Sequence, residues 1–557
     1  MTTNQRLVQI DRILTREATR ADTQRAETPR AASRLVRLAG PSTLRGRMEV
    51  PLTIADHLRR ASLVYGDRIG VIDEGDQPAP SLGELTYRRF SELSSGLAAG
   101  LDHLGLGLGA RVAIVSHNAA RVLVHLFGTS AFGRVAVPIN FRLSRAEVAY
   151  IVEHCGAEVL IIDPELESTL GDIPVKHRFI AGEQSDSLYR VGTEPVAWTP
   201  DESATASINY TSGTTARPKG VEMTHRNLWV NAATFGWHTG VSDRDVYLHT
   251  LPMFHCNGWG MPYVMTAMGV PHVVLRKVDG AEILRRVEQH GVTIMCGAPA
   301  VVAAILDAAA EWDGEIPGRG QVRIVVAGAP PPTKTIERVE TELGWEFIQI
   351  YGLTETAPLL TINRNRAEWD ELTPAERASK LSRQGNPALG ITMALADDGE
   401  VLARGNVILK SYWDNPEATA DALVDGWFHT GDGGIIDEDN YVTLQDRKKD
   451  VIISGGENVS SIEVEDCLFS HPDVTEVAVI GVPHDKWGET VKALVVLAPD
   501  ASVTDQDLID HCRERIAHYK CPTSVEMRDE LARTATGKLQ KFKLRAPYWA
   551  DQERQIN

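Results

Sequence analysis

Apolar and polar positions alternate along the chain in segments that predict both helices and strands. The stretch LTYRRFSELSSGLAAGLDHLG (85–105) has helical spacing, and helices are also predicted over 119–132 and 144–154. Between them, the short apolar runs RVAIVSHN, VAVPIN and EVLIID are typical of buried strands. The same alternation continues through 281–311, where a helix, a short buried strand and another helix follow one another. This order is typical of crossover units in a mainly parallel sheet and predicts an α/β fold.

The pattern changes after about residue 390, where strands begin to dominate. ITMALA, GEVLARGNVILK and YVTLQD read as strands, and the tail adds TEVAVIGV, VKALVVLA and a helix over 504–516. The charged junction QDRKKD has the composition of an exposed linker or hinge, although an ordinary surface turn would look the same. We therefore predict a large N-terminal domain of several subdomains over 48–446, with sheets rich in parallel strands, and a small mobile α+β domain over 447–557.

The first 47 residues differ from the rest of the chain. They hold ten Arg, no Lys and four acidic residues, with few large apolar groups. Such a segment cannot build a core, and we expect a disordered leader over 1–47.

Composition limits the classes of partner. The chain has 557 residues, of which 43% are hydrophobic and 24% charged, and 75 acidic against 57 basic residues give a net charge of -18. A partner nucleic acid held by a general basic surface is therefore not expected. No apolar run reaches 18 residues and the start does not read as a secretory signal, so we expect a cytoplasmic protein that would contact a membrane only through a surface patch. The six cysteines show no metal-ligand spacing and read as free thiols; a reactive Cys256 beside His255 is the less favoured reading.

The stretch YTSGTTARPKGVEMTH (210–225) carries the strongest chemical signal. It places hydroxyls, flexible backbone and the cation of Lys219 in a short loop after an apolar run, which suits a phosphate group. It is not a Walker A loop, because Pro218 stands where the second Gly belongs and Gly220 where Ser or Thr belongs. On composition alone, a solvent-exposed turn is the alternative.

Two further clusters add to this loop. YGLTE (351–355) follows the strand-like EFIQI, and TGD (430–432) follows WFH. Each alone reads as a turn or a helix cap. Together they supply an aromatic ring for a purine, a Glu for a hard cation and an Asp for ribose hydroxyls, which are the parts of an ATP site.

The order and spacing of YTSGTTARPKG, YGLTE, WFHTGD, DRKKDVIISGGENV and RTATGK resemble the adenylate-forming superfamily, which comprises acyl-CoA synthetases, adenylation domains and firefly luciferase. The resemblance covers 51–549. It implies a large N-terminal and a small mobile C-terminal domain, with ATP, Mg²⁺ and coenzyme A as cofactor and co-substrates. It also implies that a carboxylic acid is first adenylated, with release of pyrophosphate, and then transferred to a thiol.

The resemblance also implies roles for individual residues. Tyr351 would stack on adenine, Asp432 and Arg447 would take the ribose hydroxyls, and Glu355 would bind Mg²⁺. Thr354, Glu355 and Lys538 are the expected catalytic residues, and Lys538 would bridge the acid and the α-phosphate. The residues expected to bind ATP or AMP are Thr211, Ser212, Gly213, Thr214, Thr215, Lys219, Gly328, Ala329, Pro330, Tyr351, Gly352, Asp432 and Arg447. Lys449 stands at the family's hinge position, and Gly455 and Gly456 would line the channel for the CoA arm.

The loop LPMFHCNGWG resembles the acyl-pocket segment of acyl-CoA synthetases, with His255 and Trp259 as pocket residues. It lacks the Asp that amino-acid-activating domains carry, so we expect an acid with an uncharged tail, most readily a medium- to long-chain fatty acid. Short thioether or aryl acids stay open, as does an acyl-AMP ligase that loads a carrier protein. A regulatory protein that kept the fold without turnover is the rival from another class. A homodimer is common among related long-chain enzymes, but the sequence does not determine the oligomeric state.

Overall fold

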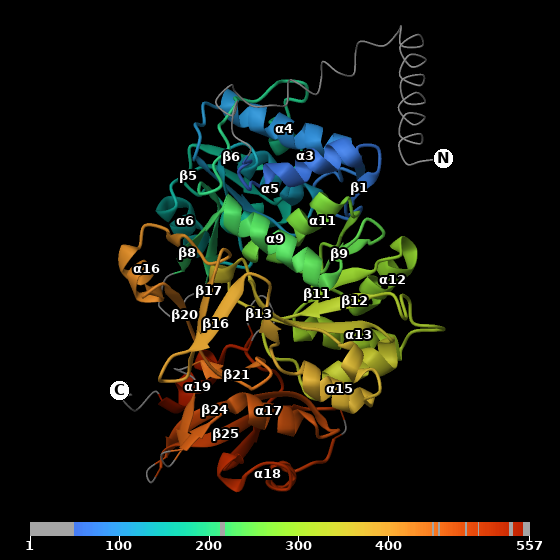
Figure 1. The fold of residues 1–557 in the computed structure, drawn as a ribbon, viewed down its shortest axis with the longest axis vertical. Coiled ribbons are helices and arrows are strands. Elements are labelled where there is room, and N and C mark those ends of the chain that lie inside the picture. The colour runs from blue at the N-terminus through green and yellow to red at the C-terminus, as the bar shows by residue number, and fades with distance from the viewer. Residues whose placement is uncertain are drawn as a thin grey trace, which may run out of the picture. The chain divides into compact units, whose positions relative to one another are not determined.

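The computed structural model describes residues 49–211, 218–447, 451–454, 457–484, 487–499, 501–533 and 539–549. The chain divides into a small unit, Met1–Val50 with Ala197–Thr199, and a large unit, Pro51–Val196 with Pro200–Asn557. All helices and strands below belong to the large unit (Figure 1). The expected leader over 1–47 lies outside the described residues.

A seven-stranded sheet carries the first predicted strands. Its order is β18-β8-β7-β4-β3-β5-β6, and the pairs among β7, β4, β3, β5 and β6 are parallel. The pairs β7 with β8 and β8 with β18 are antiparallel. The strands are β3 Arg111–Val115, β4 Val135–Ile139, β5 Ala157–Ile162, β6 His177–Ile180, β7 Thr205–Thr211, β8 Lys219–Thr224 and β18 Ser411–Tyr412.

The helices predicted around this sheet form close to the expected positions. The prediction over 119–132 is confirmed by α5, Ala120–Ser130, which is buried along its whole length, and that over 144–154 by α6, Arg145–His154. Ser144 and Glu147 begin α6 with a reciprocal capping box. The stretch 85–105 contains α4, Tyr87–His103, whose buried face includes Phe90, Leu93 and Leu97.

A nine-stranded sheet holds the predicted helix-strand-helix stretch. Its order is β15-β14-β13-β12-β11-β9-β10-β1-β2, parallel from β13 to β1 and antiparallel at both ends. Helices α12, Gly280–His290, and α13, Pro299–Ala310, lie beside β11 and β12 and bury apolar side chains against them (Figure 1). The strands are β1 Ile69–Ile72, β2 Glu84–Thr86, β9 Tyr247–His249, β10 His272–Val274, β11 Ile294–Gly297, β12 Arg323–Val326, β13 Glu346–Gly352, β14 Leu359–Asn363 and β15 Asn386–Pro387.

The strand-rich part after residue 390 forms an antiparallel sheet of its own, of order β16-β17-β20-β19, with β21 paired to β20. Two expectations need correction here. TGD is not a turn, because it lies within β20, and GEVLARGNVILK forms a strand only over its first half. The strands are β16 Ile391–Leu395, β17 Glu400–Gly405, β19 Leu423–Val424, β20 Trp427–Ile436 and β21 Val442–Arg447.

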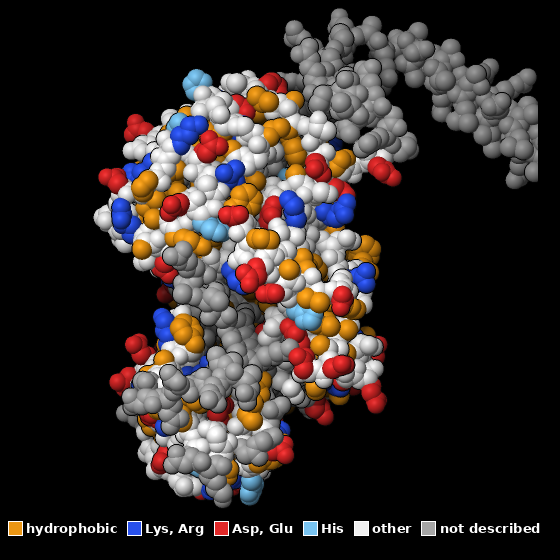
Figure 2. Space-filling model, turned by 90° about the vertical axis from the view of Figure 1, so that its left-hand side faces the viewer, with side chains coloured by type: hydrophobic (Ala, Val, Ile, Leu, Met, Phe, Trp, Pro, Cys, Tyr) orange, Lys and Arg blue, Asp and Glu red, His pale blue; other side chains and the backbone are white. Residues whose placement is uncertain are grey.

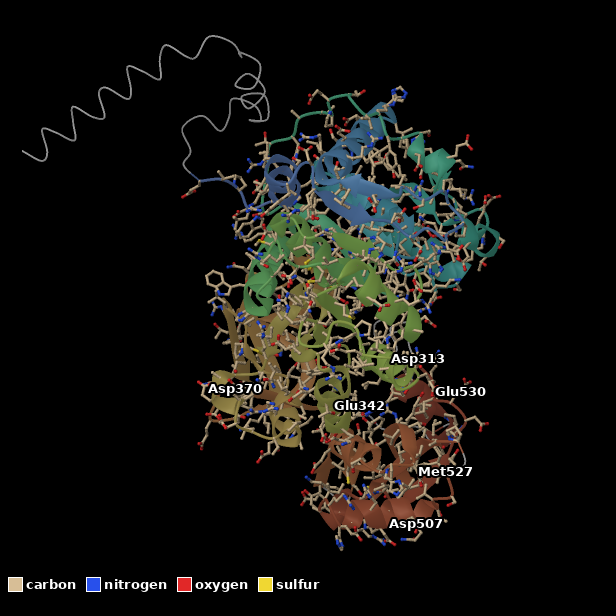
Figure 3. The ribbon with its side chains drawn as sticks, turned by 90° about the vertical axis from the view of Figure 1, so that its right-hand side faces the viewer. Asp313, Glu342, Asp370, Asp507, Met527 and Glu530 are labelled. Atoms are coloured by element: carbon tan, nitrogen blue, oxygen red, sulfur yellow. The ribbon has the colours of Figure 1, made fainter. Side chains whose placement is uncertain are left out.

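The tail forms a fourth sheet with a separate apolar core, which confirms the small C-terminal α+β domain of the predicted fold class. The helix expected over 504–516 is α18, Asp505–Arg513, the helix on which Figure 3 labels Asp507. The other elements are β22 Ile452–Ser454, β23 Glu457–Val459, β24 Val474–His484, β25 Gly488–Leu497, β26 Ser524–Met527, α17 Ser461–Phe469 and α19 Lys541–Trp549.

The charged stretch RNRAEWDELTPAERASKLSRQG (364–385), which follows YGLTE, is only partly helical. Its helical part, α15, Pro374–Leu381, begins at a capping box of Thr373 and Glu376. The residues before it form a short 3₁₀ turn, and Asp370 lies exposed at the edge of the molecule (Figure 3). Trp369 of that turn is buried beside Tyr441. The buried Trp369 ring therefore holds this segment against the protein, a contact that the charge pattern alone does not predict.

The remaining helices are short or flank the site. They are α3 Ala55–Val64, α7 Glu167–Leu170, α8 Glu183–Asp186, α9 His225–Thr239, α10 Cys256–Trp259, α11 Met261–Met268, α14 Thr333–Arg338, α16 Pro416–Ala422, the π-helix η4 Val339–Leu343, and the 3₁₀ turns η3 Pro164–Leu166, η5 Thr354–Thr356, η6 Ala367–Trp369 and η7 His518–Lys520. None of the helices in the described part of the chain combines the length and hydropathy that crossing a membrane requires. On the face drawn in Figure 2, acidic and basic side chains are intermixed over the described surface.

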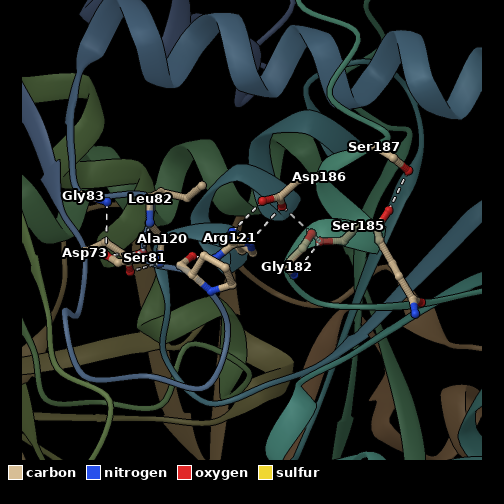
Figure 4. Close-up of polar contacts among 12 residues, drawn as sticks. Asp73, Ser81, Leu82, Gly83, Ala120, Arg121, Gly182, Ser185, Asp186 and Ser187 are labelled. Carbon is tan, nitrogen blue, oxygen red and sulfur yellow. Dashed lines mark hydrogen bonds and ion pairs between the residues drawn. The ribbon is translucent and has the colours of Figure 1, made fainter.

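Buried polar contacts fix the start of α5 (Figure 4). Asp73, which follows β1, accepts hydrogen bonds from the backbone N–H groups of Ala120 and Leu82, both at 2.8 Å. Arg121 is 4% exposed and donates to both carboxylate oxygens of Asp186 and to the carbonyl oxygen of Pro80. A buried carboxylate so placed satisfies N–H groups that would otherwise lack partners.

Replacement of Asp73 by Ala should therefore lower the free energy of unfolding by about 2 to 4 kcal/mol, because buried donors lose a charged acceptor. Urea denaturation followed by tryptophan fluorescence measures the change. Asp76→Ala removes an exposed carboxylate three residues away and should change stability by less than about 0.5 kcal/mol. Equal midpoints for the two variants would contradict the structural role of Asp73.

Candidate functional site

The predicted phosphate loop joins two antiparallel strands. Thr211 ends β7 and Lys219 begins β8, and the two residues are paired across the hairpin. Ser212, Gly213, Thr214 and Thr215 lie outside the described residues. The hairpin thus places the two ends of the loop, and the Lys219 cation, side by side.

A tyrosine that sequence reasoning did not single out connects Lys219 to Glu355. Tyr412 lies on β18, which pairs with β8. The Nζ atom of Lys219 lies 5.0 Å from the centroid of the Tyr412 ring, and the phenol donates a hydrogen bond of 2.9 Å to Oε1 of Glu355. Burial raises the pKa of the Tyr412 phenol, and the charge of Glu355 raises it further, so this group remains a donor. The residues SYW (411–413) form no motif that a single sequence would reveal, so sequence analysis did not identify Tyr412.

Thr354 and Glu355 lie directly after β13, in the 3₁₀ turn Thr354–Thr356, and both are half-buried. The carbonyl oxygen of Glu355 accepts a hydrogen bond of 2.7 Å from the N–H of Leu409, which fixes the backbone of the turn. Among the residues that the structure describes, no cluster of three or more His, Cys, Asp or Glu could enclose a metal ion. A single carboxylate near the predicted phosphate loop fits Mg²⁺, which is commonly held by one or two carboxylates and substrate phosphates.

The proposed adenine and ribose residues meet at one point. Tyr351 and Asp432 are both buried, and the Tyr351 phenol donates a hydrogen bond of 2.8 Å to Oδ2 of Asp432. The register of β20 and β21 pairs Asp432 with Arg447, whose side chain lies outside the description. The structure thus brings together two residues that the motifs assign to one nucleotide site.

Gly328, Ala329 and Pro330 follow β12, the parallel neighbour of β13. The carboxyl ends of adjacent parallel strands lie at the same edge of a sheet, so this segment and Tyr351 share that edge. Gly352 has a packing reason of its own: a Cβ atom there would overlap the carbonyl oxygen of Pro358.

The expected acyl-pocket segment contains a left-handed turn. Five consecutive residues, 256–260, have φ values of 48°, 51°, 62°, 59° and 78°. Residues other than Gly and Asn rarely adopt this backbone conformation, which costs about 1 to 2 kcal/mol for each such residue. The half-buried His255 precedes the turn, and Trp259 within it is 4% exposed.

Buried amides hold this turn in place. Asn257 donates to Oγ of Ser207 at 2.8 Å and accepts from Nδ2 of Asn209 at 3.2 Å, and all three side chains are at most 1% exposed. Asn231 on α9 donates to the carbonyl oxygen of Trp259 at 3.2 Å. Because Ser207 and Asn209 lie on β7, the amides connect the strand before the phosphate loop to the acyl-pocket turn. Asn257 and Gly258 are residue types that favour a turn, but the sequence does not indicate which side chains they contact.

The cysteines act as packing groups in the part of the chain described. All six are buried and free of disulfides. Burial raises the pKa of the Cys256 thiol, and Glu355 adds to this shift, so the reading of Cys256 as a reactive thiol is not supported. Lys449, Gly455, Gly456 and Lys538 lie outside the described residues.

Comparison with known proteins identifies the family. The family described as "AMP-binding enzyme" matches residues 58–413, and "AMP-binding enzyme C-terminal domain" matches residues 463–538. The chain belongs to the AMP-binding enzyme family and is an acyl-activating ligase of the adenylate-forming superfamily. The resemblance read from the motifs is thereby confirmed.

Relatives at this level include ligases for quite different acids. The chain is 35% identical to 2-methylpropanoate–CoA ligase CCL4 of Humulus lupulus, over 89% of this chain and 95% of that protein. It is 34% identical to the peroxisomal trans-cinnamate:CoA ligase of Petunia hybrida, over 90% and 94%. Among solved structures, O-succinylbenzoate coenzyme A synthetase of Bacillus subtilis with ATP and magnesium superposes with a TM-score of 0.74 at 27% identity, over 88% and 99%. The family thus uses ATP with Mg²⁺, and coenzyme A as co-substrate.

The left-handed turn yields a prediction that separates backbone strain from hydrogen bonding. Asn257→Gly tolerates positive φ but removes the amide that bonds to Ser207 and Asn209. KM for the acid should therefore rise about tenfold, while KM for ATP changes less than about twofold. Asn257→Ala adds the backbone strain and should raise KM for the acid about fivefold further. Steady-state kinetics with each substrate varied in turn measures both values.

Asn440 provides the matched control, because it is exposed and also has positive φ, 62°. Asn440→Gly and Asn440→Ala should leave both KM values unchanged. An equal rise in KM for the acid and for ATP in the Asn257 variants would show that the turn does not act on the acid in particular.

Proposed function

We propose that the chain is an ATP-dependent, AMP-forming CoA ligase for a carboxylic acid with an uncharged tail. An oxygen of the acid attacks the α-phosphorus of ATP, the bond to pyrophosphate breaks, and an acyl adenylate forms. The sulfur of CoA then attacks the acyl carbon, AMP leaves, and the thiol proton passes to solvent. The observation that carries this proposal is the joint placement of Lys219, Tyr412 and Glu355 beside the β7-β8 hairpin.

The chain's own residues supply positioning and charge, since no protein nucleophile is required. We assign the phosphates to the loop from Thr211 to Thr215 with Lys219, the α-phosphate to Thr354, and the ribose to Asp432 and Arg447. Glu355 would hold Mg²⁺, which when bound neutralises phosphate charge. Lys538 would then balance the charge that develops between the acid and the α-phosphate. These roles are supported by the family and by the contacts of Lys219, Glu355, Tyr351 and Asp432.

The second half-reaction requires a different set of residues. We propose a domain boundary between 48–446 and 447–557, with Lys449 as the hinge that absorbs the rotation between adenylation and thioester formation. Gly455 and Gly456 would leave room for the pantetheine arm of CoA, because a side chain there would obstruct it.

An uncharged acid tail fits the surroundings of the left-handed turn. The side chains that hold the turn in place are all neutral: Ser207, Asn209, Asn231 and Asn257. Because a charged tail would need a partner in such surroundings, an acid with an ammonium group is disfavoured. Medium- to long-chain fatty acids are the first candidates from the resemblance of the loop. Short branched and aryl acids are the second, favoured by the relatives that act on 2-methylpropanoate and cinnamate. Transfer to a carrier-protein thiol is the alternative second step.

A competition assay tests this assignment. The full chain is incubated with ATP, Mg²⁺, CoA and an equimolar mixture of acetate, 2-methylpropanoate, octanoate, palmitate, benzoate, cinnamate and phenylalanine, and products are identified by mass spectrometry. We expect acyl-CoA from one group of neutral-tailed acids, with the preferred acid at least tenfold ahead of phenylalanine, since an unpaired buried charge costs more than about 1.4 kcal/mol. Acyl-AMP that accumulates without a CoA ester would favour the carrier-protein alternative. A preference for phenylalanine would contradict the uncharged-tail proposal.

A further inference from the structure

Tyr412 is held in place by contacts on both sides of its short strand. The N–H of Lys410 donates to the carbonyl oxygen of Glu222 at 3.0 Å, and that of Trp413 donates to the carbonyl oxygen of Gly220 at 2.7 Å. On the other side, the N–H of Tyr412 donates to Oγ1 of Thr419 in α16 at 3.0 Å. The position of the ring is therefore set by two separate elements, which indicates a constrained position.

The ring separates two opposite charges. Its face contacts the Lys219 ammonium, at 5.0 Å from Nζ to the centroid, and its hydroxyl donates to Glu355 at 2.9 Å. Each contact stabilises one charge without neutralising it, since an aromatic face attracts a cation and a phenol donates to a carboxylate. Tyr412 therefore contacts the ammonium group through its ring and the carboxylate through its hydroxyl.

A neighbouring Lys and Glu, one just before β18 and one on β8, show the arrangement that forms without an aromatic ring between the charges. Lys410 and Glu222 make a direct ion pair, with Nζ 2.8 Å from Oε1. Ser411 also donates to Oε2 of Glu222. The opposite charges of Lys410 and Glu222 therefore neutralise each other. A similar pairing of Lys219 with Glu355 would withdraw the phosphate cation and the metal-binding carboxylate together.

We propose that Tyr412 is a positioning residue that prevents Lys219 and Glu355 from pairing and directs them to the phosphates and Mg²⁺ of bound ATP. This inference rests on the proposed function. Tyr412 itself does not contact the reacting atoms. Its hydroxyl orients the carboxylate, and its ring orients the ammonium group, so the two contacts have separate effects.

Two substitutions separate the effects. Tyr412→Phe removes the hydroxyl but keeps the ring beneath Lys219, and Tyr412→Leu removes both contacts. Calorimetric titration of ATP into the full chain, without acid or CoA, gives Kd in the presence of Mg²⁺ and in EDTA, a readout that needs no turnover. We expect Tyr412→Phe to raise Kd about tenfold with Mg²⁺ and less than twofold in EDTA, because one hydrogen bond to the carboxylate is lost. Tyr412→Leu should raise Kd in both conditions.

Tyr548→Phe is the matched control. Its phenol donates to Oε2 of Glu526 at 2.6 Å, so this variant also loses a hydrogen bond from Tyr to Glu, but away from Lys219 and Glu355. It should leave Kd unchanged in both conditions. Circular dichroism checks that each variant is folded, and Tyr412→Phe keeps the test valid if Tyr412→Leu does not fold.

The outcomes distinguish this inference from the proposed function. A Tyr412→Phe chain with the Mg²⁺ dependence of the unsubstituted chain would overturn the role of Tyr412, whatever the acid assay shows. An equal weakening with Mg²⁺ and in EDTA would also overturn it, because a general structural effect would not depend on the metal. An unsubstituted chain that binds ATP with Mg²⁺ yet yields no acyl product would contradict the proposed function and leave the Tyr412 test intact.

Discussion

The antiparallel pairing of β18 with β8 is the contact on which the site depends. It brings a two-residue strand from late in the chain against the strand that begins at Lys219. Without it, neither the Tyr412 ring nor its hydroxyl would lie between Lys219 and Glu355. Because the pairing joins distant parts of the sequence, the chain must order a long intervening segment before these groups meet. The conformational entropy lost in this ordering is offset by the apolar burial and strand pairing of the sheets on either side.

Buried amides provide the second constraint. Asn257 connects the acyl-pocket turn to Ser207 and Asn209 on β7, the strand that leads to Thr211. A turn in which Cys256 and Trp259 have positive φ is costly, and such strain persists only where the surroundings fix it. The proposed acid side and the proposed phosphate side of the site are thus both connected to β7, which limits how far one can move without the other.

The sequence predicted elements with strong periodicity. The spacing of apolar residues predicted α5 and α6, and the structure adds that α5 is buried along its whole length and that a capping box of Ser144 and Glu147 begins α6. TGD looked like a turn because Gly and Asp favour turns, but pairing with β17 and β21 keeps it in a strand. In the charged segment, the burial of Trp369 beside Tyr441 is a tertiary effect that charge patterning does not report.

The same difference between local motifs and tertiary contacts applies to the site residues. Tyr351 and Asp432 were assigned to one nucleotide site because each belongs to a distinctive motif, and the structure brings their side chains into hydrogen-bond contact. Tyr412 and Asn257 were missed because their partners lie far away in sequence, and neither letter is unusual where it stands. What a single sequence lacks is the register that pairs one strand with another.

The proposed function requires that the chain activates a carboxylic acid as an adenylate before any thiol takes part. A direct test is the exchange of radiolabelled pyrophosphate into ATP by the full chain, with Mg²⁺ and without CoA. We expect label in ATP only when the preferred acid is present. Label that enters ATP without any acid, or no exchange when an acid known to give acyl-CoA is present, would contradict this order of steps.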